Sequence, residues 1–255
     1  METTLKNVDI SEKSKFLAAV FRYVFFFLLI TAAVNGLLGF IFLQLFPIQS
    51  YIGASSIGGG TYDPSAEQYF AVYVGLLIGS AIFLFALMIW IMIVSFKQRG
   101  NLFVPFTLYA INMGVLLSAC TLFVPVTTVA ISLGITCLTF GLMFVIGYFT
   151  KVNTSILWMI VIGLLVGSLL ISLFNIIWSI FFPQTFDNIY WLVSFAIFGA
   201  MMLITIIDVA NMKRIAERGE GSRNLALFCA FNLYVDFIYM FIRILAVVAR
   251  FTGRK

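Results

Sequence analysis

Long apolar runs recur along the entire chain, and short polar breaks separate them. The runs cover residues 17–46, 69–95, 102–123, 127–149, 155–181, 189–211 and 224–249. Each run reaches or exceeds the roughly 20 residues with which a helix crosses about 30 Å of hydrocarbon. A lipid-facing backbone must satisfy its hydrogen bonds within its own segment, which favours helices as the spanning units. The pattern predicts an all-α membrane protein with about seven transmembrane helices.

The composition agrees with this prediction and argues against a soluble domain, a zinc site and a disulfide-linked fold. The 255 residues are 63% hydrophobic and 10% charged, whereas a soluble domain is nearer half apolar and a quarter charged. The chain has no histidine, which removes the commonest general base and the commonest zinc ligand. Cys120, Cys137 and Cys229 lie far apart in apolar stretches, so neither a metal cluster nor a disulfide framework is indicated. We therefore expect no enzyme activity and no resident cofactor.

Lysine and arginine residues occupy every second loop. They are Lys6, Lys13 and Lys15 before the first run, Lys97 and Arg99 after the second, Lys151 after the fourth, and Lys213, Arg214, Arg218 and Arg223 after the sixth. The intervening loops contain only acidic charges. Because cytoplasmic loops retain Lys and Arg, the amino terminus is predicted to be cytoplasmic. The chain then divides into a cytoplasmic segment, residues 1–16, a transmembrane domain, residues 17–249, and a basic tail, residues 250–255.

The basic tail conflicts with this orientation. Seven crossings place Arg250, Arg254 and Lys255 outside, against the charge rule. Either these late charges fail to override the earlier ones, or the last segment does not cross completely. The net charge of +5 comes mostly from the cytoplasmic loops. It favours contact with anionic lipid head groups and does not indicate nucleic-acid binding.

Four charged residues lie inside the predicted helices, where charge is costly and indicates function. Arg22 is near the cytoplasmic start of the first helix, where its long side chain can reach the interface, so the other three are of interest. Asp208 is near the end of the sixth run, and Asp236 and Arg243 are in the last. Polar residues of the last run follow i, i+3, i+7, i+10, i+14 spacing: Cys229, Asn232, Asp236, Tyr239 and Arg243. This spacing places them on one helical stripe. Since such a stripe cannot face lipid, we expect the last helix to be central.

The two aspartates are predicted to lie at nearly one depth. With the sixth helix running on to Gly219 and the last helix capped by Ser222, Asp208 is 11 residues before the turn and Asp236 is 14 residues after it. At about 1.5 Å per residue, their depths differ by only about 4 to 5 Å. Two antiparallel neighbours would thus hold both carboxyl groups within reach of each other.

Two close carboxylates in a low dielectric cannot comfortably both ionise, so the pair is expected to share a proton and titrate as a unit. Such a pair is a proton-dependent latch. It is also a weak site for a hard cation such as Ca²⁺, with Asn side chains, carbonyls and water supplying further oxygens. Thr205 and Asn211 lie on the face of Asp208 and add polar groups there. The alternative is a hydrogen-bonded pair that only locks the two helices together.

With these residues in view, the chain resembles the Bax-inhibitor family of membrane proteins (transmembrane BAX inhibitor motif proteins). The segment IIDVANMKRIAE, residues 206–217, is similar to the family's helix-6 Tyr-Asp-Thr-x-x-Ile pattern. The segment LYVDFIYMFIRIL, residues 233–245, is similar to the Leu-Tyr-x-Asp-Phe-Ile-Asn-x-Phe motif of helix 7. Weaker similarity covers LFNIIW, residues 173–178, and IGYFTKVNTSILW, residues 146–158. The resemblance extends over about residues 97–250.

The resemblance implies seven helices with the last one central and a pH-sensitive Ca²⁺ leak across the membrane. The family's paired aspartates fall on Asp208 and Asp236. The resemblance also indicates a bacterial type of the family in the inner (plasma) membrane. Supporting polar positions are Asn232, Asn211, Arg243 and Asn175, with Lys97 or Arg99 nearest to the family's gating arginine. The chain departs from the motifs at Tyr239, Ala246 and Asn153, where the family has Asn, Arg and Asp.

Three functions compete on this reading. The first is a leak pathway for Ca²⁺ or another cation, closed by the Asp208–Asp236 latch. The second is a non-conducting partner that binds and restrains other membrane proteins, such as a membrane protease. The third, an intramembrane aspartyl protease, has the two helical aspartates it needs but lacks the Gly-x-Gly-Asp signature. We expect the first of these, with lipid, a cation and other membrane proteins as partners.

Overall fold

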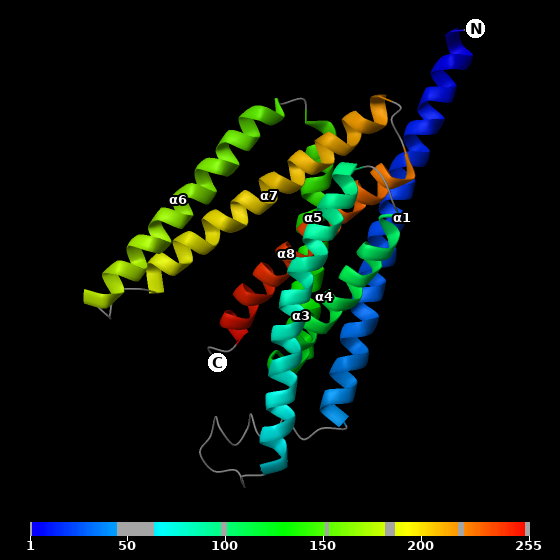
Figure 1. The fold of residues 1–255 in the computed structure, drawn as a ribbon. Coiled ribbons are helices and arrows are strands. Elements are labelled where there is room, and N and C mark those ends of the chain that lie inside the picture. Colours follow the sequence, from blue (N-terminus) through cyan, green and yellow to red (C-terminus); the bar gives the residue numbers. More distant parts are fainter. Residues whose placement is uncertain are drawn as a thin grey trace. The chain divides into compact units, whose positions relative to one another are not determined.

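The computed structural model describes residues 2–44, 64–97, 101–150, 153–181, 187–218 and 222–252. Within these ranges, the side chains of residues 2–12, 42–44, 64–70, 96–97, 120–123, 175–181 and 187–191 lie outside the description. The described elements are all helices (Figure 1): α1 Glu2–Gln44, α3 Pro64–Lys97, α4 Phe103–Phe123, α5 Val126–Phe149, α6 Thr154–Phe181, α7 Asp187–Arg218 and α8 Arg223–Thr252. The prediction of an all-α protein with about seven helices is confirmed.

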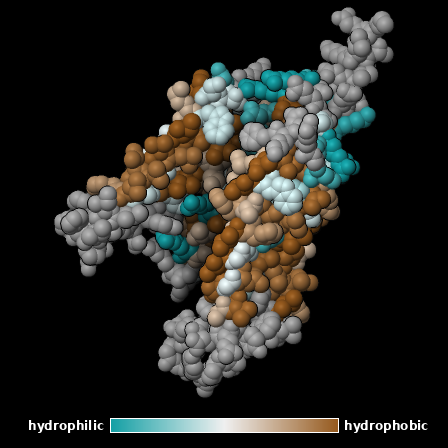
Figure 2. Space-filling model, viewed as in Figure 1, coloured by the Kyte–Doolittle hydropathy of each residue, from teal (hydrophilic) through white to brown (hydrophobic). Residues whose placement is uncertain are grey.

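The helices are long and apolar enough for a membrane. Six contain candidate spans, and the described apolar part of α4, Phe103–Ala119, is somewhat shorter. The whole of α4 has 21 residues, which corresponds to about 31 Å of helix. Hydrophobic side chains cover the shafts of the helices in Figure 2, as expected where lipid is the solvent. The chain is therefore an integral, multi-pass membrane protein.

Several helices extend beyond the apolar runs. The first run begins at residue 17, whereas α1 begins at Glu2, so the predicted cytoplasmic segment is mostly helical and continuous with the first span. Helix α7 continues past the apolar run to Arg218, as the Gly219 stop predicts. Hydropathy identifies only the part of a helix that lies in lipid. The backbone hydrogen bonds of the helix can continue into water at little cost, so a helix can be longer than its apolar run.

Short polar side chains cap three helix starts. The Oδ1 atom of Asn101 accepts a hydrogen bond from the Phe103 amide at 3.1 Å, and that of Asn153 accepts one from Ser155 at 3.2 Å. Ser222 Oγ accepts from the Leu225 amide at 3.2 Å, which confirms the predicted cap of the last helix. Each cap satisfies one of the amides that the first turn leaves without a partner.

The chain forms two compact units. One unit combines residues 18–130 and 222–231, and the other combines residues 1–17, 131–221 and 232–255. The first unit is built around an aromatic cluster in which the rings of Phe27 and Phe106 stack at 3.6 Å and Phe106 meets Phe231 edge-on. Helices α1 and α4 approach closely there: a Cβ on Gly114 would lie 2.8 Å from the Thr31 carbonyl.

The second unit contains α5, α6, α7 and most of α8, and it holds both aspartates. Helices α6 and α7 pack side by side along their length (Figure 1). Helix α5 meets α7 at Gly147, where a Cβ would lie 2.8 Å from the Ile206 carbonyl. Lys213 Nζ donates to the Tyr148 carbonyl at 2.8 Å, so the end of α7 is also tied to the last turn of α5.

Helix α8 is the most buried of the candidate spans. The buried share of its apolar window is 61%, whereas the shares of the other five lie between 11% and 28%. Because a lipid-facing helix exposes most of its surface, this difference fits the expectation that the last helix is central. The polar stripe of α8 is therefore mostly within protein, although Tyr239 is 41% exposed.

Candidate functional site

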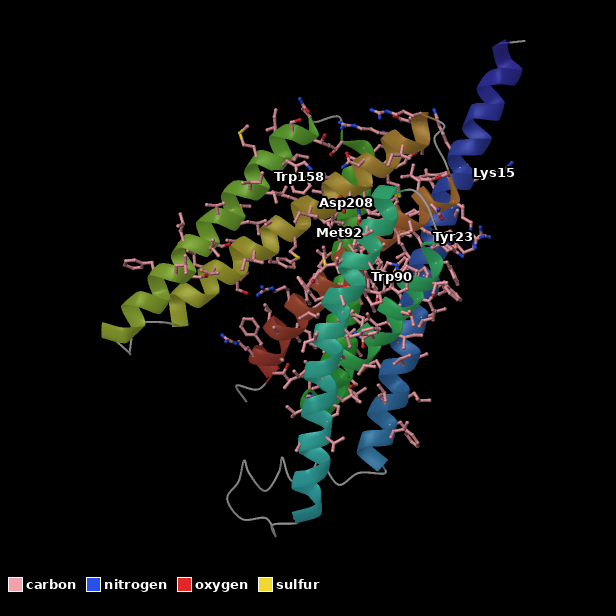
Figure 3. All side chains as sticks on the ribbon, in the orientation of Figure 1. Lys15, Tyr23, Trp90, Met92, Trp158 and Asp208 are labelled. Atoms are coloured by element: carbon pink, nitrogen blue, oxygen red, sulfur yellow. The ribbon has the colours of Figure 1, made fainter. Side chains whose placement is uncertain are left out.

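The two predicted aspartates lie on neighbouring parts of the second unit. Asp208 is on α7 and is marked in Figure 3, and Asp236 is on α8. Both side chains are half-buried. Both predicted carboxyl groups therefore belong to this unit, and that they lie within reach of each other stays a prediction.

Asp236 is incompletely satisfied by hydrogen bonds. Its carboxyl group is bonded to the side chain of Thr205, which lies one turn before Asp208 on α7. Its Oδ2 atom is buried and has no hydrogen-bond partner in the described part of the chain. Buried polar atoms are nearly always paired, so an exception of this kind indicates a proton, a water molecule or an ion that completes the site.

The Thr205 hydroxyl responds to the proton on Asp236. It donates to the Met201 carbonyl at 3.1 Å, and a hydroxyl has only one proton to donate. While this bond is made, Asp236 can bond to Thr205 only as a donor, which requires a protonated carboxyl group. When Asp236 is ionised, the hydroxyl must turn from Met201 to the carboxylate. Proton loss at Asp236 therefore breaks the bond from Thr205 to Met201 within α7 and reverses the direction of the bond between Thr205 and Asp236.

The region around Asp208 and Asp236 contains few ligands for a divalent cation. Among the described residues, no group of three or more Cys, Asp or Glu side chains is suited to holding a metal ion. Two carboxylates, amide oxygens, carbonyls and water can offer a weak, transient Ca²⁺ site, whereas a tight one needs six to eight oxygens. These residues could therefore hold Ca²⁺ only weakly.

The supporting polar residues fall into three groups. Asn211 and Asn232 are half-buried on the helices of the two aspartates, and neither makes a hydrogen bond within the described chain. Arg243 is seven residues beyond Asp236, forms no ion pair with a described carboxylate, and lines a separate cavity. The side chains of Asn175 and Lys97, and the whole of Arg99, lie outside the described residues. For these positions the assigned roles stay predictions.

Sequence reasoning placed Thr205 beside Asp208 but missed its bond to Asp236. It also missed Gly147, whose lack of a side chain lets α5 approach the backbone of α7 directly before Asp208. The only signal for Gly147 was its place in the segment that resembles the family. The contact itself joins residues about 60 positions apart, and periodicity along one helix cannot reveal it.

Comparison with known proteins agrees with the family resemblance of the motifs and with the helical membrane fold. A search of the curated proteins found no match to this chain. A family model described as "Inhibitor of apoptosis-promoting Bax1" matches residues 13–253, which is nearly the whole chain. The matched range includes every described transmembrane helix and both aspartates. The chain belongs to the Bax inhibitor family of membrane proteins.

Proposed function

We propose that this protein is a pH-sensitive leak pathway for cations, Ca²⁺ first, and that Asp208 and Asp236 form its latch. The observation that carries the proposal is the buried Oδ2 atom of Asp236, which has no hydrogen-bond partner in the described part of the chain. A purely structural lock would be expected to satisfy this atom, because an unpaired buried acceptor costs about 1–3 kcal/mol. A site that binds and releases a proton or a cation needs such an oxygen atom free to bind it.

The latch works through the charge of the pair. With one proton shared, the carboxyl groups hold α7 and α8 together through hydrogen bonds. With both ionised, two like charges about 4 Å apart repel by about 4 kcal/mol at an effective dielectric near 20. This repulsion is relieved when the helices separate or a cation enters. Cation flux should therefore rise as pH increases through the range in which the pair loses its proton.

The experiment is Ca²⁺ entry into proteoliposomes between about pH 6 and 8, measured for wild type, Asp208→Asn and Asp236→Asn. Each variant removes one charge and keeps the capacity to hydrogen-bond. Wild-type flux should rise with pH, and the pH response should be lost in both variants while they remain folded. A wild-type flux without a pH response, or variants with the wild-type response, would refute the latch.

A second function is favoured by the description of the matching family, which names an inhibitor of another protein. In that case the protein conducts no ions and instead restrains other membrane proteins, such as a membrane protease. Absence of Ca²⁺ flux from correctly folded protein in liposomes would favour this function. In either case we propose a protein without catalytic activity, located in the bacterial inner membrane with its amino terminus in the cytoplasm.

A further inference from the structure

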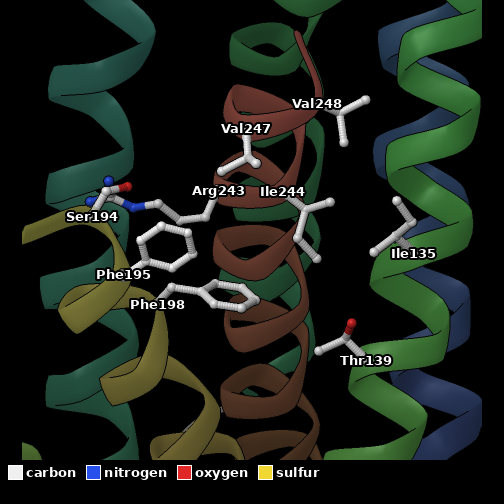
Figure 4. A pocket seen from close by; sticks show the side chains of 9 residues that line it. All are labelled: Ile135, Thr139, Ser194, Phe195, Phe198, Arg243, Ile244, Val247 and Val248. Atoms are coloured by element: carbon white, nitrogen blue, oxygen red, sulfur yellow. The ribbon is translucent and has the colours of Figure 1, made fainter. Parts of the chain in front are cut away.

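The second unit contains a cavity that the proposed ion latch does not use. The cavity has a volume of about 230 Å³ and is partly open. Its walls come from three helices: Ile135 and Thr139 of α5, Ser194, Phe195 and Phe198 of α7, and Arg243, Ile244, Val247 and Val248 of α8 (Figure 4). Ile135 is 41% exposed and Phe195 is 62% exposed, so the rim of the cavity belongs to the apolar outer surface of the unit.

One charge lies in these otherwise mainly apolar walls. The Arg243 side chain extends across the cavity toward Ser194, above the rings of Phe195 and Phe198 (Figure 4). Arg243 makes neither an ion pair nor a hydrogen bond with any described residue. A guanidinium group stays charged in proteins and has five N–H donors in a planar fork, which matches carboxylate and phosphate groups. Inside a membrane, a positive charge that no described residue compensates is costly, and an anion would compensate it.

The size and lining of the cavity restrict what can fill it. An apolar cavity of about 150 Å³ is large enough for a benzene molecule, whereas each bound water needs two to four polar partners. Outside Arg243, only the hydroxyl groups of Thr139 and Ser194 are polar here. Water alone is thus a poor occupant, and the arginine repels cations. The lining suits a hydrocarbon chain that has an anionic group at one end.

The position of Arg243 along α8 fits the boundary of a membrane. Helix α8 has 30 residues, or about 45 Å, against a hydrocarbon core of about 30 Å. With the helix centred in the core, the Cα of Arg243 is about 7 Å inside the boundary, and a long arginine side chain can reach from there to the head groups. Seven residues, or about 10 Å of helix, separate Arg243 from Asp236.

From these observations we propose that the cavity between α5, α7 and α8 binds an anionic phospholipid, with an acyl chain against Phe198 and Val247 and the phosphate on Arg243. The charge of Arg243 selects the head group, and the apolar walls retain the chain. A neutral lipid with the same chains lacks the net negative charge that compensates the guanidinium. A free phosphate ion lacks the chain.

The test is native mass spectrometry of the purified full-length protein with added dioleoyl phosphatidylglycerol or dioleoyl phosphatidylcholine, which share their acyl chains. The wild type should retain phosphatidylglycerol at least about tenfold better, a difference of about 1.4 kcal/mol. Arg243→Gln should abolish this preference. Arg250→Gln makes the same change seven residues further along α8, outside the cavity lining, and should keep the preference.

A second variant and a soluble probe separate the two parts of the site. Val247→Phe keeps the arginine but fills the cavity, so it should weaken phosphatidylglycerol retention while the protein stays folded. Glycerol phosphate, which has the anion without the chain, should fail to displace the lipid. The proposal is overturned by equal retention of both lipids in the wild type, by wild-type preference in Arg243→Gln, or by displacement with glycerol phosphate. Because the readout is lipid binding, the result is independent of whether the protein conducts Ca²⁺.

Discussion

At the scale of single residues, the main feature of the candidate site is that the Asp236 carboxyl group lacks a hydrogen bond at one of its oxygens. Asp236 has a bond to Thr205 and one buried oxygen without a described partner. Thr205 is itself fully buried and also bonds to the Met201 carbonyl. The Thr205 hydroxyl therefore bonds both to the backbone of α7 and to the carboxyl group on α8. A change in either bond affects the other, because the hydroxyl has only one proton.

Thr205→Val tests this role, because valine has nearly the same shape and lacks the hydroxyl. Removing the hydroxyl leaves a buried carboxyl group with one bond fewer, which costs about 1–3 kcal/mol. We expect a lower melting temperature for Thr205→Val in detergent and little change for Thr205→Ser, which keeps the hydroxyl. Equal melting temperatures for wild type and the valine variant would contradict the proposed bond.

At the scale of helices, much of the fold was predictable from sequence. The apolar runs gave the number and order of the helices, and the Gly219–Ser222 turn gave the end of α7 and the cap of α8. The long extension of α1 to Glu2 was missed, because hydropathy does not record helix outside lipid. The cavity at Arg243 was missed for another reason: its walls combine three helices, and voids depend on packing between segments distant in sequence.

The contact between α5 and α7 yields a matched pair of variants. In Gly147→Ala, the new Cβ would lie 2.8 Å from the Ile206 carbonyl and 2.9 Å from Val209 Cβ, so the helices must separate. Overpacking of this kind costs about 1–3 kcal/mol. Gly141→Ala changes the same helix where nothing lies within 4 Å of the new Cβ, and alanine gains up to about 1 kcal/mol of helix propensity.

We therefore expect thermal unfolding to show a lower melting temperature for Gly147→Ala and an unchanged or higher one for Gly141→Ala. Since Ile206 and Val209 flank Asp208, the Gly147 variant should also alter the pH response of Ca²⁺ flux. A Gly147→Ala protein as stable as wild type would mean that α5 and α7 pack less closely than described.

The tie between α7 and the last turn of α5 gives a further prediction. Lys213 Nζ bonds to the Tyr148 carbonyl and lies 5.0 Å from the centre of the Tyr148 ring. Its positive charge is also favourable at a helix carboxyl end. Lys213→Met should lower the melting temperature by an amount that corresponds to about 1–2 kcal/mol, whereas the exposed Arg218→Gln should change it little. Similar effects of the two substitutions would show that the bond to Tyr148 does not stabilise the protein.

At the scale of the whole molecule, two features bear on topology. The basic residues of alternate loops predict a cytoplasmic amino terminus. Helix α8 is also long and apolar enough to cross a membrane, so its length gives no reason for an incomplete crossing. The choice between the two explanations for the basic tail stays open and depends on whether α8 crosses completely.

Cysteine labelling tests the orientation and the last crossing together. In a protein whose three native cysteines are replaced by alanine, single cysteines are introduced at Gly59, Gly100 and Gly253. A membrane-impermeant thiol reagent applied outside intact cells should label Gly59→Cys and leave Gly100→Cys unlabelled, because only the loop of Gly100 carries the basic residues that stay in the cytoplasm. Gly253→Cys should also be labelled from outside, because an odd number of crossings separates it from the amino terminus.

Permeabilised cells, in which all three positions should react, provide the control for accessibility. Labelling of Gly100→Cys from outside would overturn the orientation, whereas protection of Gly253→Cys alone would show that α8 does not cross completely despite its length.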